Sequence, residues 1–303
     1  MRTGPVLAAT DFSAAAELAE QQAAAIARAL GRALHLVHAV HRVEDPEGLV
    51  GMSPDLVEGL RQAAADRLEQ RAAALRSDRL AVTTGLDLGQ PSAVIASEAE
   101  ARQAALVAVG SRGLTGFRHL LLGSTAERVV RRATFPVLVV HPTDGGMPLP
   151  PRRVLLATDF SAAARAAGEA ARELLGLDAE CELALLHCWQ PPVNLGMYAF
   201  EGWSAMSESY RGEVLRALGE RLASEAEKWR EQGLRVETAL LEGLPAEAIT
   251  AEAAHRQSDC IVLGSRGQTA GRWLFGSTAK RVVQQARCPV LTAAAEENTA
   301  AEE

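Results

Sequence analysis

Features that mark membrane, secreted and nucleic-acid-binding proteins are scarce in this sequence. No apolar run among its 303 residues approaches the roughly 20 residues that a membrane span needs. The N-terminus leads from Arg2 into a short strand without the apolar core of a signal peptide. With 31 basic against 38 acidic residues the net charge is −7, which argues against nucleic acid as the main partner because phosphate neutralisation needs clustered Lys and Arg. We expect a cytoplasmic protein that contacts neither membranes nor nucleic acid.

Cysteine is also scarce, and its pattern excludes further classes. The four cysteines all lie in the second half of the chain and none form a CxxC pair: Cys181, Cys188, Cys260 and Cys288. We expect reduced, buried residues here, and neither a disulfide nor a structural zinc site. A Walker loop (GxxxxGK followed by Ser or Thr) and a GxSxG elbow are both missing. With no general base in view besides aspartates, this favours a binding protein over an enzyme with rapid turnover.

The histidines do not suggest a metal site. His35, His38 and His41 fall on one predicted strand, where side chains alternate between the two faces. His35 and His41 therefore point to one face and His38 to the other. The three side chains cannot converge on one ion.

The chain does contain one unit of about 150 residues that is present twice. The residues from Val6 to Ala16 are closely repeated from Val154 to Ala164, and shorter matches follow in the same order. A stretch rich in Gly and Pro separates the copies. We predict a first domain at residues 1–143, a linker at 144–152, a second domain at 153–295 and a disordered acidic tail at 296–303.

Each unit alternates predicted strands and helices. In the first unit we expect strands at Val6–Ala9, Ala33–Val40, Leu80–Leu86, Ala105–Val109 and Pro136–Val140. This alternation is typical of an α/β fold. We predict two Rossmann-like, doubly wound domains, each a five-stranded parallel sheet in the order 3-2-1-4-5 with helices on both faces.

The last strand of each unit is apolar and is expected at the edge of its sheet, at Pro136–Val140 and Pro289–Leu291. An uncovered edge invites pairing with another strand. We expect the two halves to pair with each other there. Whether the whole chain also forms a homodimer is left open by the sequence.

Each unit carries a glycine loop between a buried strand and a helix start. The first loop reads Gly110-Ser-Arg-Gly113, nine residues, then Gly123-Ser124-Thr125, and the second reads Gly264-Ser-Arg-Gly267, eight residues, then Gly276-Ser277-Thr278. Such a loop presents backbone N–H groups to an anion, with the positive end of the helix dipole behind them. Asp11 and Asp159 follow the first strand of each unit and should face the loop across the crevice where strand order reverses. The pattern predicts phosphate binding.

Together these residues resemble the universal stress protein family in its tandem two-domain form. The family's nucleotide-binding members share a motif of Gly, two residues, Gly, nine residues, Gly, then Ser or Thr, which Gly110, Gly113, Gly123 and Ser124 match. The Asp-Phe-Ser after the first strand and the ends of the second strands, Leu36-Val-His38 and Leu185-Leu-His187, match as well. The resemblance covers both halves, nearly the whole chain outside linker and tail.

The resemblance implies that the first half binds ATP. Asp11 would contact the adenine or ribose end, the backbone near Ala39 would border the adenine and Gly110 would approach the ribose. Gly113, Gly123, Ser124 and Thr125 would hold the phosphates. In the second half the matching positions are Asp159, Cys188, Gly264, Gly267, Gly276, Ser277 and Thr278. Its loop departs from the motif by one residue, which can move donors by up to ~3.5 Å, so we expect ATP in the first half before the second.

Simpler interpretations of these residues stay open. Ser124-Thr-Ala-Glu127 fits a helix capping box, which Lys280 interrupts in the second copy. The two aspartates are suited to capping the helices that follow them, a role for which Ser13 and Ser161 compete.

Two further features each have two interpretations. Arg112 and Arg266 either reach phosphates or are solvated loop residues. The segment from Gln190 to Gly212, rich in aromatic residues, is either a lid or subunit contact near the second crevice, or a variable surface loop.

The function we predict is that of an ATP-binding stress protein that acts through conformation or partner contacts. One alternative is a stress factor of the same fold that dimerises and binds no nucleotide. Another is a slow ATPase, for which a Mg²⁺ ion would neutralise the phosphates.

Overall fold

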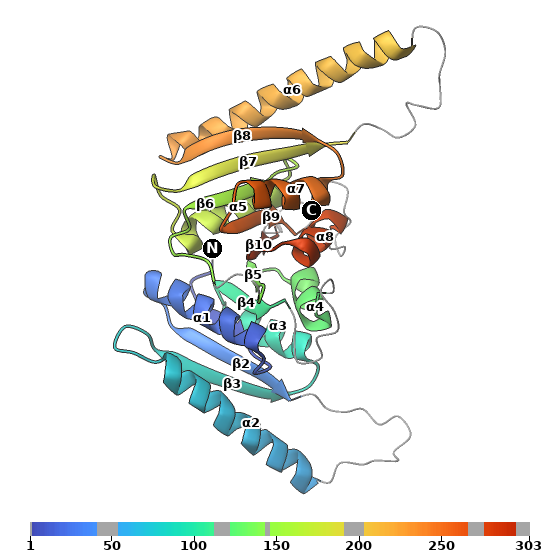
Figure 1. Ribbon diagram of the computed structural model, residues 1–303. Helices are drawn as coiled ribbons and strands as arrows, with labels where there is room; N and C mark the ends of the chain where they lie inside the picture. Colours follow the sequence, from blue (N-terminus) through green and yellow to red (C-terminus); the bar gives the residue numbers. More distant parts are fainter. Residues whose placement is uncertain are drawn as a thin grey trace, which may run out of the picture.

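The computed structural model describes residues 2–40, 54–111, 122–142, 146–190, 203–265 and 276–294. The first half forms, in chain order, β1 (Val6–Ala9), α1 (Ala14–Ala29), β2 (Leu34–Val40), α2 (Pro54–Leu75), β3 (Val82–Leu88), α3 (Pro91–Ala101), β4 (Leu106–Gly110), α4 (Ser124–Arg132) and β5 (Val137–Val140). The second half repeats the series as β6 (Arg153–Ala157), α5 (Ala162–Leu175), β7 (Glu182–Trp189), α6 (Trp203–Glu231), β8 (Arg235–Glu242), α7 (Pro245–His255), β9 (Cys260–Gly264), α8 (Ser277–Gln285) and β10 (Val290–Ala293) (Figure 1).

Helices begin at residues whose chemistry favours a helix start. Ser13 caps α1, its Oγ accepting a hydrogen bond from the Ala16 amide at 3.2 Å. Ser161 caps α5 in the same way, accepting from the Ala164 amide at 3.1 Å. Helices α3 and α7 begin with Pro91 and Pro245, where the missing N–H would have had no helical partner.

The described strands make one ten-stranded sheet in the order β3-β2-β1-β4-β5-β10-β9-β6-β7-β8. Neighbouring strands are parallel within each half, which confirms the predicted order 3-2-1-4-5. Strands β5 and β10 are antiparallel, with Leu138 opposite Leu291 and Val139 opposite Val290. We call this pairing the seam. It joins the two sheets into one.

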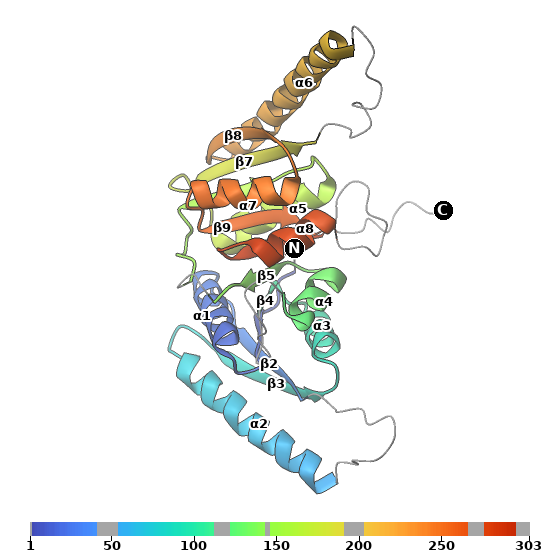
Figure 2. The same ribbon diagram turned by 45° about the vertical axis from the view of Figure 1, so that its right-hand side comes forward.

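Helices cover both faces of the sheet in two apolar layers. One layer packs α1, α2, α5 and α6 on the strands, and the other packs α3, α4, α7 and α8. Figure 2 shows α1 on one side of the first half's strands, with α3 and α4 on the other. Side chains alternate as a strand requires, so Val6 and Ala8 enter the first layer and Leu7 the second. Both layers contain residues of both halves, and the core is therefore continuous across the seam.

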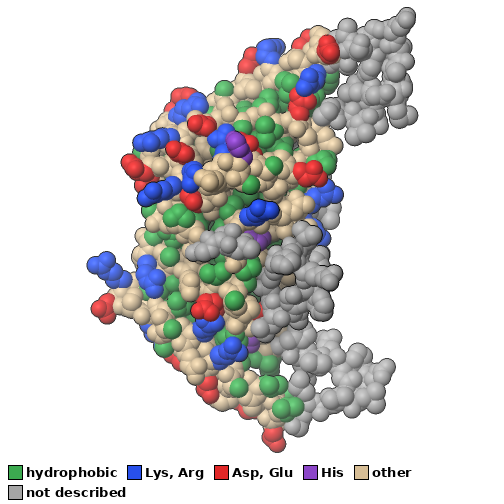
Figure 3. Space-filling view, in the orientation of Figure 1, with side chains coloured by type: hydrophobic (Ala, Val, Ile, Leu, Met, Phe, Trp, Pro, Cys, Tyr) green, Lys and Arg blue, Asp and Glu red, His purple; other side chains and the backbone are tan. Residues whose placement is uncertain are grey.

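Acidic and basic side chains are interspersed over the described residues of the face shown in Figure 3. None of the described helices is long and apolar enough to cross a membrane. Residues 203–212, expected in the aromatic loop, are the first turns of α6. The loop prediction is wrong for this part. Residues 191–202 and the tail 296–303 lie outside the described residues.

Candidate functional site

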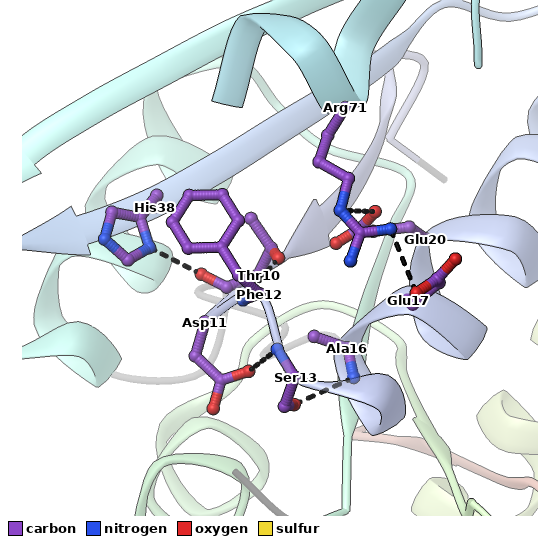
Figure 4. A network of polar contacts seen from close by, with 9 residues as sticks. All are labelled: Thr10, Asp11, Phe12, Ser13, Ala16, Glu17, Glu20, His38 and Arg71. Atoms are coloured by element: carbon purple, nitrogen blue, oxygen red, sulfur yellow. Dashed lines mark hydrogen bonds and ion pairs between the residues drawn. The ribbon is translucent and has the colours of Figure 1, made fainter. Parts of the chain in front are cut away.

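The chain after β1 makes a tight turn that its own side chains fix (Figure 4). Thr10 Oγ1 accepts a hydrogen bond from the Phe12 amide at 3.0 Å, and Asp11 Oδ1 accepts one from the Ser13 amide at 3.0 Å. Phe12 has a φ of 65°, in the left-handed region that is strained for a bulky residue. Ser13 is the N-cap of α1, so the capping interpretation of Asp11 is wrong. Asp11 shapes the turn instead.

The second half repeats this turn with nearly the same distances. Thr158 Oγ1 accepts from the Phe160 amide at 2.9 Å, and Asp159 Oδ1 accepts from the Ser161 amide at 3.0 Å. Phe160 has a φ of 62°, and Ser161 is again the N-cap. Strained backbone of this kind persists where its surroundings hold it, and it is frequent at ligand sites.

A stack of side chains supports each turn, and sequence reasoning missed it. The Phe12 and His38 rings are 4.5 Å apart, and the Arg67 guanidinium of α2 lies 4.6 Å over the Phe12 ring. In the second half the rings of Phe160 and His187 are also 4.5 Å apart, with Arg221 of α6 at 4.2 Å over the Phe160 ring. A signal was present in the sequence, because the two arginines occupy equivalent positions of the repeat.

Hydrogen bonds fix the tautomer of the stacked histidines. His38 Nδ1 lies 2.8 Å from the carbonyl oxygen of Thr10, and His187 Nδ1 lies 2.7 Å from that of Thr158. Because a carbonyl oxygen only accepts, Nδ1 carries the proton. Burial lowers the pKa of His38, so its ring is neutral near pH 7 and Nε2 is an acceptor.

His35 lies on the opposite face of β2, as the alternation predicts. Its Nδ1 is 2.7 Å from Thr83 Oγ1, and its Nε2 is 3.1 Å from Glu98 Oε2. Across the part of the chain that the structure describes, no three His, Cys, Asp or Glu side chains are grouped to hold a metal ion.

The first glycine of each loop is needed for packing. A Cβ on Gly110 would lie 2.8 Å from the backbone carbonyl carbon of Ala15, and one on Gly264 would lie 2.9 Å from that of Ala163. The end of β4 therefore packs directly on the first turn of α1, and β9 packs on α5 in the same way. This contact brings the glycine loop beside the Asp11 turn. It also explains the glycines without a ligand.

Both glycine loops close at their base with the same hydrogen bond. The Gly123 amide donates to the Ser111 carbonyl at 2.8 Å, and the Gly276 amide donates to the Ser265 carbonyl at 3.0 Å. Gly123 and Gly276 have almost identical backbone angles, with φ of −59° and −60°. The residue missing from the second loop therefore does not displace the helix start. Gly113, Gly267, Arg112 and Arg266 lie outside the described residues.

The first amides of α4 and α8 have no acceptor within the part of the chain that the structure describes. Gly123 is the N-cap of α4 and Gly276 that of α8, and neither helix has a side-chain cap. The capping-box interpretation of Ser124 is therefore wrong. Among the described residues no acceptor takes the first three helical amides, which belong to Ser124, Thr125 and Ala126 in α4 and to Ser277, Thr278 and Ala279 in α8. Such amides, backed by the helix dipole, can bind an anion.

Small side chains lie at the ends of β2 and β7. Ala39 is half-buried and packs against the layer that contains α3 and α4. Cys188 takes the equivalent position, and burial raises the pKa of its thiol to about 11. A thiol with that pKa is protonated at neutral pH and is a poor nucleophile.

Both halves of the chain match the same family. Residues 3–141 and residues 151–293 each match the universal stress protein family. The chain belongs to this family.

Its relatives match it over one half or over both. A universal stress protein of Mycobacterium tuberculosis strain H37Rv is 29% identical over 305 residues, with 95% of each chain covered. Another, from Methanocaldococcus jannaschii, is 32% identical over 143 residues, which are 46% of this chain and 80% of that protein. The crystal structure of a universal stress protein from Archaeoglobus fulgidus has a TM-score of 0.71 and 20% identity, covering 97% of this chain and 99% of its own. That likeness shows the fold.

The two halves of this universal stress protein differ where the helix after the turn packs against the next helix, α1 against α2 and α5 against α6. In the first half Glu20 of α1 is 1% exposed and its Oε2 lies 4.0 Å from Arg71 Nε, while Arg71 also pairs with Glu17 at 3.1 Å. Burial raises the pKa of Glu20. In the second half Gly168 takes the position of Glu20, and a Cβ there would lie 2.6 Å from the Trp229 ring of α6. In the first half α2 contacts α1 through these ion pairs. In the second half α6 contacts α5 through the Trp229 ring.

The second half of this universal stress protein also contains a groove of about 730 Å³, at the end of the sheet where β9 and β10 begin. It runs between α7, the end of α8 and Cys288, at the start of β9 and β10. The repeat has Phe135 where the second half has Cys288. The Phe135 ring is 2% exposed and lies 5.5 Å from the Arg2 guanidinium. The smaller Cys288 lines the groove at the position that this ring occupies in the first half.

Proposed function

We propose that this universal stress protein binds ATP in the crevice between the Asp11 turn and the glycine loop after β4. It would act in the stress response through nucleotide-dependent conformation or partner contacts. The observation that carries the proposal is the start of α4, where three amides have no acceptor among the described residues at the closed base of a glycine loop. Helix starts of this kind stabilise phosphate groups.

Two buried hydroxyl groups support the proposal. Ser111 and Ser265 follow the first glycine of each loop and are 1% and 3% exposed. Among the described residues their Oγ atoms have no hydrogen-bond partner, which is costly for a buried hydroxyl. A phosphate or ribose oxygen bound in the crevice would supply the missing partner.

The other end of the crevice suits the base and ribose. Asp11 is held by the turn, so its carboxylate is positioned before a ligand arrives. Ala39 is small and leaves room beside it for a flat base at the end of β2. Asp159 and Cys188 would take these roles in the second half.

We extend the proposal to the second crevice in spite of its shorter loop. Gly264, Gly276, Ser277 and Thr278 are placed as their counterparts in the first half. The first turn of α8 holds no acidic residue, whereas that of α4 holds Glu127. The second helix start is therefore at least as favourable for an anion.

Mass spectrometry of the denatured, purified protein tests for co-purified nucleotide, and calorimetric titration with ATP and Mg²⁺ measures the number of sites. We expect two sites. Gly123→Val and Gly276→Val should each abolish one, because the new side chain stands over the free amides. Gly59→Ala is the matched control, since a Cβ there meets nothing within 4 Å, and it should bind as the wild type does. Absence of both nucleotide and heat at millimolar ATP would overturn the proposal.

A further inference from the structure

An ion pair joins helices α4 and α8 across the seam. Lys280 Nζ lies 2.6 Å from Glu127 Oε1, with the side chains 43% and 28% exposed. The two helices lie side by side in both views (Figures 1 and 2). Each residue belongs to the first turn of its helix, four positions after the glycine N-cap. The pair therefore joins equivalent positions of the repeated unit.

A residue that contacts its own counterpart lies on the approximate two-fold axis that relates the two halves. Leu138 and Leu291 do the same in the strands, since they are equivalent in the repeat and lie opposite each other at the seam. In a pair of two first halves, Glu127 would thus meet a second Glu127. In a pair of two second halves, Lys280 would meet a second Lys280.

The strands of the seam do not distinguish these pairings. Residues 137–139 read Val-Leu-Val, and residues 290–292 read Val-Leu-Thr. They are apolar or β-branched and fully or almost fully buried. Either strand could pair with a copy of itself without burying a charge. The ion pair between the helices beside the seam does distinguish the pairings.

We propose that Glu127 and Lys280 determine which halves pair, favouring the two unlike halves of one chain over like halves of two copies. The need for such a device follows from synthesis, because the first half is complete while the second is still being made. Its apolar edge strand β5 is then uncovered, and such an edge pairs readily with another copy. Repulsion between two Glu127 side chains opposes that pairing, and attraction between Glu127 and Lys280 stabilises the pairing of the first half with the second half of the same chain. This proposal does not depend on nucleotide binding.

Charge reversal in the full chain tests the proposal directly. The E127K variant places a lysine opposite Lys280, as in a pair of second halves, and K280E places a glutamate opposite Glu127, as in a pair of first halves. At low salt we expect each to melt about 1–2 °C below the neutral variant E127Q/K280Q, the shift that roughly 1 kcal/mol produces in a chain of 303 residues. The swapped variant E127K/K280E should melt with the wild type, above the neutral variant. All differences should shrink in 1 M salt, where the screening length is only about 3 Å.

The control is R281E, which makes the same charge change as K280E one residue further on, at an exposed position of α8. It should not lower the melting temperature. If E127K and K280E melt with the neutral variant, the like-charge contact carries no penalty and the proposal is wrong. A swapped variant that stays as unstable as the single reversals would also overturn it.

Discussion

Glu20 makes the stability of the first half depend on pH. Its carboxyl group is buried behind the Asp11 turn, and the groups that face it are the Thr10 hydroxyl, Arg71, Glu17 and Asp11. Burial raises its pKa above the ordinary value of 4.5. Protonated Glu20 therefore stabilises the fold fully below pH 4.5, and this contribution is lost as the pH rises through the raised pKa.

Replacing Glu20 with Gln should remove that dependence. We expect E20Q to be more stable than the wild type at neutral pH, because no charge has to be buried, and the advantage should vanish below pH 4.5. Urea unfolding midpoints measured from about pH 4 to about pH 8 provide the check. E17Q is the control: Glu17 also pairs with Arg71, but its side chain is 46% exposed, so it should bring no such advantage. An E20Q effect that is equal at every pH would contradict the role of burial.

At the scale of elements, the outer helices α2 and α6 are anchored by different chemistry. Arg71 ties α2 to Glu17 of α1, whereas Trp229, which is 5% exposed, ties α6 to Gly168 of α5. An aromatic ring packed on a glycine leaves no room for a side chain at that position. The contact of α5 with α6 is therefore more sensitive to added volume than its alanine-rich sequence suggests.

Gly168→Ala should loosen α6. The new methyl group would lie 2.6 Å from the Trp229 ring, and we expect a loss of about 1–3 kcal/mol, as for other overpacked cores. Gly219→Ala on α6 itself is the control, because its Cβ meets nothing within 4 Å. It should instead stabilise the protein by about 0.5–1 kcal/mol. Denaturation midpoints measure both, and faster amide exchange in α6 should accompany only Gly168→Ala. Equal effects of the two variants would rule out this packing argument.

The elements that sequence reasoning predicted are those that depend on local patterns. The strand order followed from alternation and duplication, and strand bounds moved by about two residues, as from Leu80–Leu86 to Val82–Leu88. Short motifs also predicted that Asp11 lies just after β1 and that a helix starts directly after Gly123, as it does. Arg67 and Glu20 were missed because their partners come from other elements. The periodicity of apolar residues within one element does not reveal that α2 contacts the turn after β1.

At the scale of the whole molecule, the seam makes two similar halves into one core. Leu138 and Leu291 are both 0% exposed, lie opposite each other and belong to the same apolar layer. That layer continues from α2 at one end of the sheet to α6 at the other. Since each half contributes to the burial of the other, we expect calorimetry of the wild type to show a single unfolding transition.

Leu138→Ala and Leu291→Ala test this coupling. Each removes a buried side chain and should cost about 2–5 kcal/mol. Because the two residues lie opposite each other, the double variant should cost less than the sum, the second truncation enlarging a cavity that already exists. Leu138→Ala combined with Leu222→Ala on α6, which covers the outer strands, should instead be additive. Urea unfolding gives all the free energies. Additive losses for the facing leucines, or two separate transitions in the wild type, would mean that the halves fold as independent domains that merely touch.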